Sequence, residues 1–149
     1  MSFREKSAWA CLATTIAVFV PYFAYVLALF EREELATTSV LTAFIAAVIF
    51  SIVLNVAAHI GIAIRSRQEK KDERDIVIES KSFKYAYYVL AVSYFLAIGC
   101  VVVFAVAPVP MPSDYLLAPA LIGQIFLLCF VVAEATRFLI QAVSYRRGS

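Results

Sequence analysis

Few residues of this sequence are charged, only one is a histidine, and no two of its cysteines lie close together. Charged residues make up 16% of the 149 residues and hydrophobic residues make up 63%, a composition far from that of a typical soluble domain. We therefore do not expect a water-soluble fold. The single histidine, His59, cannot supply the paired axial ligands of a membrane haem within one chain.

The three cysteines, Cys11, Cys100 and Cys129, each fall inside an apolar run. Because the sequence has no Cys-x-x-Cys pair, it indicates neither a redox couple nor a zinc site. We expect each cysteine to be a small buried hydrophobic residue. No metal ion and no cofactor is predicted.

Motifs of familiar membrane enzymes and carriers are also missing. The chain has no His-Glu-x-x-His run, which intramembrane metalloproteases need, and no reactive cysteine pair for disulfide chemistry. Small four-helix drug exporters couple transport through a carboxylate in their first helix, whereas residues 8–30 contain no acidic residue. An enzyme is therefore the least favoured class of function, and no catalytic residue is predicted.

Four long apolar runs make up most of what is present. They cover about residues 8–30, 41–64, 85–107 and 115–141, and a helix needs about 20 such residues to cross the hydrocarbon core of a membrane. The sequence thus predicts an all-α integral membrane protein, a bundle of four antiparallel transmembrane helices that forms one domain over residues 1–149. The first run is too long for the apolar part of a signal peptide, so we expect it to be a retained helix.

The connection between the second and third runs, residues 65–84, is rich in charges of both signs. Asp72 is suited to cap a helix that starts there, so the third helix is able to begin as an extension outside the membrane. A mixed-sign segment of this kind is typical of a solvated helix or linker. The alternative is a docking surface for a cytoplasmic protein partner or for anionic lipid headgroups.

The distribution of basic residues predicts the orientation of the helices. All of the 13 Lys and Arg residues except Arg32 lie at the amino terminus, in the connection over residues 65–84, or towards the carboxyl terminus. Cytoplasmic loops of membrane proteins carry the excess of Lys and Arg. We therefore expect both termini and the charged connection on the cytoplasmic side of the inner membrane.

Ionisable residues inside an apolar run are costly in a membrane and are the best candidates for a functional site. Glu134 is one, with Arg137 three residues further along the fourth run, and a local ion pair between them would account for its presence. Asn55 and His59 lie at a comparable depth on the second run. If the second and fourth helices face each other, these four residues form one polar cluster, which could carry a proton, bind a small ligand or specify helix packing.

The segment Lys71-Asp72-Glu73-Arg74-Asp75, followed by Ile76, Ile78, Glu79, Lys81 and the tyrosines between Tyr85 and Tyr88, resembles a group of small four-helix membrane proteins, the DUF2178-like proteins. The resemblance covers some 20 residues and the helix count. It implies no particular activity, but members of such groups often accompany a small DNA-binding regulator, which suits a membrane-held regulatory or immunity role. It marks Asp72, Glu73 and Arg74 as the most characteristic positions.

Two functions from different classes follow. The favoured one is a non-enzymatic regulatory or interaction protein that acts through its charged cytoplasmic connection, without direct contact to nucleic acid. The alternative is a small oligomeric transporter or channel in which Glu134, His59 and Asn55 line a polar path. Because four helices enclose little interior, we expect a homo-oligomer in the lipid bilayer, most simply a dimer.

Overall fold

The computed structural model describes residues 3–31, 37–65, 72–106 and 119–147. Within these ranges the chain forms four long helices, α1 (Phe3–Glu31), α2 (Thr37–Arg65), α3 (Glu73–Val106) and α5 (Pro119–Arg147). All four are long and apolar enough to cross a membrane. The all-α fold and the expectation of four helices of this kind are therefore confirmed.

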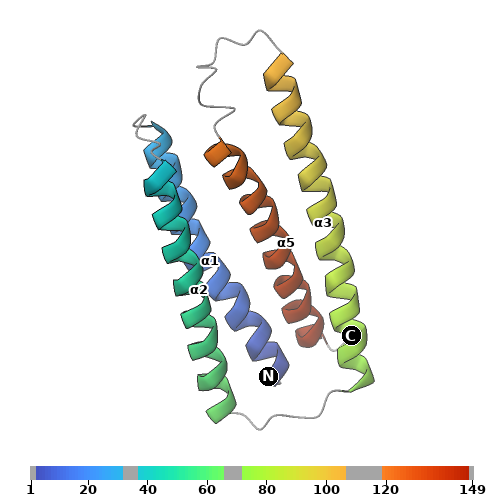
Figure 1. The fold of residues 1–149 in the computed structure, drawn as a ribbon. Coiled ribbons are helices and arrows are strands. Elements are labelled where there is room, and N and C mark those ends of the chain that lie inside the picture. The colour runs from blue at the N-terminus through green and yellow to red at the C-terminus, as the bar shows by residue number, and fades with distance from the viewer. Residues whose placement is uncertain (1–2, 32–36, 66–71, 107–118, 148–149) are drawn as a thin grey trace.

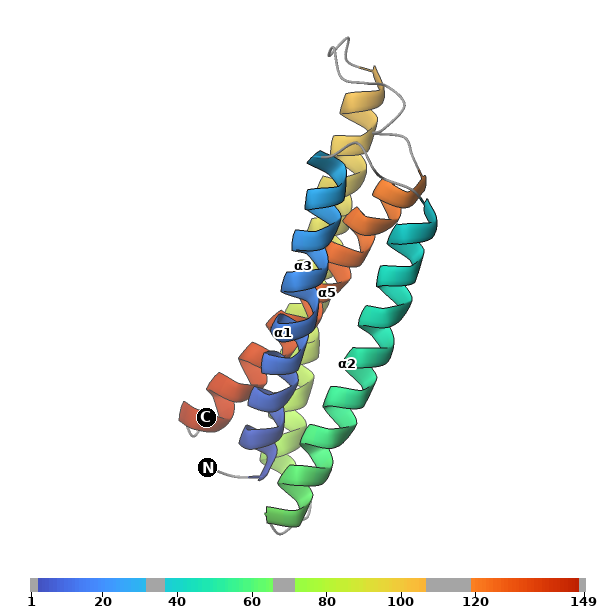
Figure 2. The ribbon, with the colours of Figure 1, turned by 90° about the vertical axis from the view of Figure 1, so that its left-hand side faces the viewer.

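Successive helices run antiparallel, so that the starts of α1 and α3 and the ends of α2 and α5 lie at one end of the molecule (Figures 1 and 2). The main helix contacts are α1 with α2, α1 with α5 and α3 with α5. The helices are thus ordered α2, α1, α5, α3, with α1 and α5 at the centre. In the most apolar stretch of α1, 33% of the residues are buried, compared with only 11% in α2 and in α3. This difference agrees with a central position for α1 and edge positions for α2 and α3.

The apolar core lies between α1 and its neighbours. Val18, Tyr22 and Val26, four residues apart on one face of α1, are buried together with Ala47 of α2. The Tyr22 hydroxyl donates a hydrogen bond of 2.6 Å to Oε1 of Gln124 on α5. A polar group at this depth is therefore satisfied across the helix contact, as burial in an apolar environment demands.

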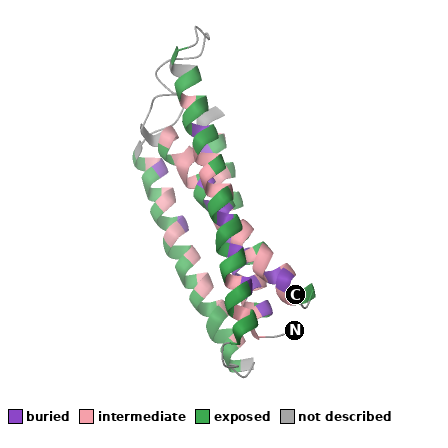
Figure 3. Cartoon of the chain, turned by 90° about the vertical axis from the view of Figure 1, so that its right-hand side faces the viewer, coloured by how far each residue is buried: buried purple, intermediate pink, exposed green. Residues whose placement is uncertain are grey.

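The outer surfaces of α2 and α3 are apolar and exposed (Figure 3). Ile49 and Phe50 on α2 and Phe95 and Leu96 on α3 are each more than half exposed. In water, a continuous surface of this kind would be costly, because burial of apolar surface is the main force that stabilises folded proteins. Hydrocarbon chains, which are as apolar as these side chains, remove that cost.

Helix α3 begins at Glu73, well before the predicted start near residue 85. Asp72 caps it as expected: the Glu73 amide donates to the Asp72 carboxylate at 2.7 Å, and the Asp72 amide donates to the Asp75 carboxylate at 2.8 Å. These two bonds satisfy two amides that the start of a helix leaves without partners. Residues 73–84, which were placed in the connection with a helical extension from Asp72 as one possibility, are thus the first turns of α3. We call them the charged head.

The other helices are also longer than the apolar runs that predicted them. Helix α1 starts at Phe3, α2 at Thr37, and α5 continues to Arg147 instead of ending at 141. The added turns of α1 and α5 carry charged residues, which form helix as readily as many apolar ones, and the added start of α2 carries hydroxyl residues. A count of apolar residues finds only the part of a helix suited to hydrocarbon. The predicted start of the fourth helix at 115 lies outside the described residues.

Candidate functional site

A polar cleft with a volume of about 500 Å³ opens at the end of the bundle where α1 and α3 begin. All four helices contribute to its lining. The lining residues are Phe3, Arg4, Ser7, Ala8, Cys11, Asn55, His59, Glu79, Arg137, Phe138, Gln141 and Tyr145. Counted from this end of the molecule, the lining reaches as far as Cys11 on α1, Asn55 on α2 and Arg137 on α5. It does not include Val18 or the other buried residues of the apolar core.

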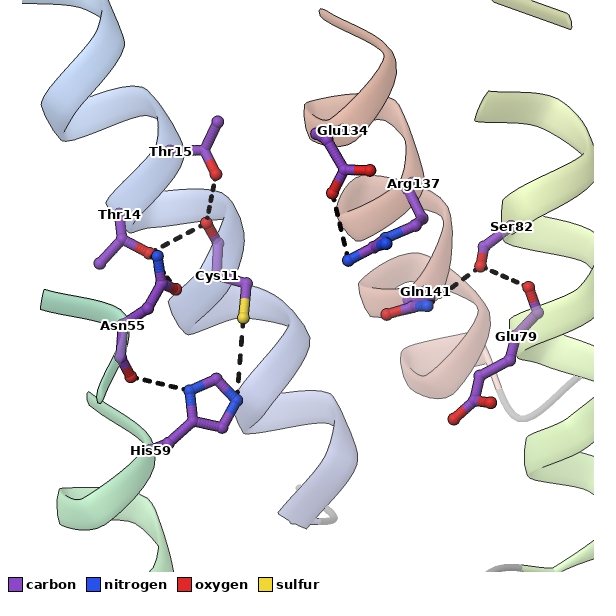
Figure 4. Close-up of polar contacts among 10 residues, drawn as sticks. All are labelled: Cys11, Thr14, Thr15, Asn55, His59, Glu79, Ser82, Glu134, Arg137 and Gln141. Carbon is purple, nitrogen blue, oxygen red and sulfur yellow. Dashed lines mark hydrogen bonds and ion pairs between the residues drawn. The ribbon is translucent and has the colours of Figure 1, made fainter. Parts of the chain in front are cut away.

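On one side of the cleft, polar side chains join α2 to α1 (Figure 4). Thr14 donates to Oδ1 of Asn55 at 3.0 Å. One turn further along α2, Nε2 of His59 lies 2.9 Å from Oγ of Ser7 and 3.9 Å from Sγ of Cys11. Nδ1 of the same ring lies 2.8 Å from the backbone oxygen of Asn55. Both Asn55 and His59 therefore contact α1, and neither is directed at α5 in these contacts.

On the opposite side, Glu134 and Arg137 form an ion pair within α5, with 3.1 Å between Oε2 and Nη2 (Figure 4). The guanidinium carbon of Arg137 also lies 4.9 Å from the ring centre of Phe83 and 4.4 Å from that of Phe138, distances at which a cation is attracted to an aromatic face. Nε of Arg137 is buried and has no hydrogen-bond partner among the described residues. Arg137 is thus held by one carboxylate and two aromatic rings at the deep end of the cleft.

The charged head of α3 closes the rim of the cleft through contacts with α1 and α5. Nε of Arg4 lies 3.0 Å from Oδ2 of Asp75, and its Nη1 lies 3.6 Å from Oε1 of Glu79. Gln141 of α5 donates to Oγ of Ser82 at 3.0 Å, and Ser82 in turn donates to the backbone oxygen of Glu79 at 2.7 Å. These bonds fix α3 to both central helices near the cleft.

Charges around the cleft largely compensate one another. Arg4 faces Asp75 and Glu79, and Arg137 faces Glu134. An arginine that keeps a carboxylate partner avoids most of the cost of partial burial. The two arginines and their three carboxylates leave no excess positive charge, so the arrangement is not that of a simple anion trap.

Three of the four residues predicted to form a cluster, Asn55, His59 and Arg137, line the same polar cleft. Glu134 is not part of the lining and is held by Arg137 at its edge. A contact of the second and fourth helices, the condition set for a single cluster, is not among the main helix contacts of the described residues, because α1 lies between α2 and α5. The predicted residues are thus brought together around α1.

The residues marked by the resemblance lie at the start of the charged head. Asp72 is the helix cap, and Glu73 and Arg74 are exposed. None of the three lines the polar cleft. The characteristic positions and the cleft are therefore separate features of the same end of the molecule.

Sequence reasoning missed the residues that α1 and α3 contribute to the site. Arg4, Ser7 and Cys11 are spaced by three and four residues, and so are Asp75, Glu79 and Ser82. Such spacing places each set on one face of a helix, and this signal was available in the sequence. The charged members were assigned instead to solvated ends of the apolar runs.

The cysteines differ in their surroundings. Cys11 and Cys129 are buried, as expected, but Cys100 is exposed, so the expectation of three buried cysteines is wrong for this one. Residue 100 lies on the outer side of α3, which packs only on α5 among its main contacts. Cys11 alone of the three lies beside a histidine among the described contacts.

Comparisons of this chain with protein-family models, with curated proteins and with solved structures give no match. The resemblance to the DUF2178-like group therefore stays a prediction. In residues 3–31, 37–65, 72–106 and 119–147, no three His, Cys, Asp or Glu side chains are grouped so that they could hold a metal ion.

Proposed function

We propose that this chain is a multi-pass protein of the inner membrane with both termini in the cytoplasm. Four helices of sufficient length and apolar character support the membrane location. The Lys and Arg residues of the described ranges gather at the end of the molecule that holds the polar cleft (Figure 1), which supports its placement on the cytoplasmic side.

Reporter fusions test this orientation. A fluorescent protein fused after Ser149 should fluoresce, because it folds in the cytoplasm, and alkaline phosphatase fused there should be inactive. The same reporters fused within residues 107–118, between α3 and α5, should behave in the opposite way. Active phosphatase at the carboxyl terminus would contradict the orientation.

The function that we propose is a non-enzymatic regulatory or interaction role, carried by the outer face of the charged head. The observation that supports it is the division of this segment into two faces. Asp75, Ile78 and Ser82 face the bundle, with Ile78 only 2% and Ser82 0% exposed, whereas Arg74 and Lys81 are exposed. A helix held firmly on one side presents its other side to a cytoplasmic protein without further loss of conformational entropy.

Site-specific photocrosslinking in cells tests this role. A photoreactive residue in place of Lys81 should give a discrete crosslinked product, and one in place of Phe95, on the apolar surface of α3, should not. The partner identified from that product, once purified, should bind the chain in nanodiscs and lose at least tenfold in affinity when Arg74 and Lys81 are replaced by glutamate. Equal binding by that variant would exclude the outer face as the binding surface.

We also propose that the chain acts as a homo-oligomer, most simply a dimer. The open order of helices, with α2 and α3 at the edges, leaves apolar side chains on both edge helices that one copy does not cover. Mass measurement in lipid nanodiscs at several lipid-to-protein ratios tests this. A single monomeric species throughout would contradict it.

A second candidate function is a small oligomeric transporter or channel. It is favoured by the polar cleft, which Asn55, His59 and Arg137 line together. It is disfavoured by the apolar cluster of Val18, Tyr22, Val26 and Ala47 that lies beyond the deep end of the cleft. Glu134→Gln in liposomes separates the two candidates, because it should abolish flux in a transporter and leave partner binding intact in an interaction protein.

A further inference from the structure

The polar cleft contains two nucleophilic side chains, Ser7 and Cys11, beside one imidazole. Ser7 and Cys11 are four residues apart on α1 and therefore lie one above the other on the same face. Oγ of Ser7 and Sγ of Cys11 lie 2.9 Å and 3.9 Å from the same atom, Nε2 of His59. Figure 4 shows the second of these contacts. One ring nitrogen thus faces both a hydroxyl and a thiol.

The other ring nitrogen determines which form of the imidazole is present. Nδ1 of His59 lies 2.8 Å from the backbone oxygen of Asn55, and a carbonyl oxygen can only accept a hydrogen bond. In the neutral ring Nδ1 therefore carries the proton and Nε2 does not. A nucleophile, a base and a group that orients the base are the three parts of an activated nucleophile.

Arg137 supplies a donor for negative charge at the same place. Its side chain is 22% exposed and lines the cleft together with Cys11, so the accessible part of its guanidinium faces a molecule bound there. When a nucleophile adds to a carbonyl carbon, negative charge develops on the carbonyl oxygen, and a fixed N–H donor stabilises it. The cleft therefore combines nucleophile, base and oxyanion donor.

The surroundings of the cleft indicate the kind of carbonyl compound that it would accept. Phe3, Ala8 and Phe138 line it among the polar residues, and the helices beyond it are apolar enough to lie in hydrocarbon. Exposed Arg146 and Arg147 directly follow Tyr145 of the lining. A long-chain acyl thioester of coenzyme A matches this arrangement, since its chain is apolar, its carbonyl is reactive and its phosphates are negative.

We propose that Cys11 is an S-acylation site that takes a long-chain acyl group directly from an acyl-coenzyme A. This activity is independent of the interaction role proposed above. A thiol is a better nucleophile at neutral pH than a hydroxyl, which favours Cys11 over Ser7. Cysteines near the surface of a membrane are also common positions of acylation.

The reaction is a thioester exchange. Sγ of Cys11 attacks the carbonyl carbon while its proton passes to Nε2 of His59, and the oxygen charge is stabilised by N–H of Arg137. The bond from the carbonyl carbon to the coenzyme A sulfur then breaks, and that sulfur takes the proton from His59. The products are a Cys11 thioester and free coenzyme A, with no change of oxidation state. Ser7, which donates to Nε2 in the resting arrangement, must release it first.

The test uses the purified full chain in nanodiscs, incubated with palmitoyl-coenzyme A and followed by intact mass and peptide mapping. We expect one palmitoyl group, removable by hydroxylamine, on Cys11. Cys11→Ala should abolish it. Exposed Cys100, which would react first if acylation were unspecific, is the matched internal control, and Cys100→Ala should react like the natural chain.

Two further variants separate activation from folding. His59→Gln should slow acylation about 100-fold, as expected for the loss of a general base, while the far-ultraviolet circular dichroism of the chain stays unchanged. Ser7→Ala should be acylated at least as fast as the natural chain, because it removes the competing donor. Acylation on Ser7, Cys100 or Cys129, an unchanged rate in folded His59→Gln, or no acylation at all would overturn the proposal.

Discussion

Replacement of Asp75 by alanine should destabilise the chain by about 2–3 kcal/mol, because one carboxylate serves two elements. Its Oδ2 accepts the Asp72 amide at 2.8 Å and lies 3.0 Å from Nε of Arg4, and the side chain is only 13% exposed. Loss of a helix cap costs about 1 kcal/mol. Breaking a fully buried pair costs about 3–5 kcal/mol, but Arg4 is 25% exposed and keeps Glu79 at 3.6 Å, so we assign about 1–2 kcal/mol to the pair.

Titration of the micelle-bound chain with a denaturing detergent measures this free energy of unfolding. Trp9, the only tryptophan, lies on α1 near Arg4 and reports on the transition by fluorescence. Glu73→Ala is the matched control, since Glu73 lies on the same turn, is exposed and should cost less than about 0.5 kcal/mol. Combined with Arg4→Met, Asp75→Ala should reveal a coupling of about 1 kcal/mol. Equal stability of the Asp75 and Glu73 variants would refute the reasoning.

Three further outcomes follow from the packing around the polar cleft. Ser82→Leu should cost about 2 kcal/mol or more in the same titration, because the site has 0% exposure and Gln141 loses its acceptor; the exposed neighbour Ser80→Leu should be close to neutral. Asn55→Ala should cost about 1 kcal/mol, the usual value for a hydrogen bond between membrane helices, since Thr14 loses its 3.0 Å partner on α2, and an unchanged midpoint would contradict this. When the Asn55→Ala variant is titrated with denaturing detergent, the rate of amide hydrogen exchange should rise in α2 before it rises in α5. The reason is that the bond between Thr14 and Asn55 joins α2 to α1 and does not involve α5.

The number and type of helices could be predicted because membrane-spanning helices are defined by composition over a fixed length. About 20 apolar residues cross the hydrocarbon core, and the chain has four runs of that length. The ends of the helices could not be found in this way. Phe3 to Lys6 and the charged head are helical without being apolar, so the signal that defines a run is missing there.

The order of the helices could not be read from the sequence either. Asn55 and Glu134 were predicted to lie at a similar distance from one end, because depth follows from position along a helix. Which helix each one faces depends on packing between distant segments. Asn55 bonds to Thr14 of α1, and Glu134 bonds to Arg137 of its own helix. Similar depth therefore suggested that the four residues form one cluster. In the structure, Asn55 and His59 lie on one side of the cleft, and Glu134 and Arg137 lie on the other (Figure 4).

Helix α1 connects the two features that we propose to be functional. Within two turns of α1, Arg4 holds the charged head through Asp75, and Ser7 and Cys11 hold α2 through His59. Between apolar helices in a lipid bilayer, such polar contacts and close packing set the geometry, because hydrocarbon solvates the helices as well as they solvate each other. An acyl group on Cys11 would take the place next to His59 that the thiol occupies. Any resulting shift at the start of α1 then acts on Arg4 and on the outer face of the charged head, and the affinity of a partner for that face should differ between the acylated and unacylated chains.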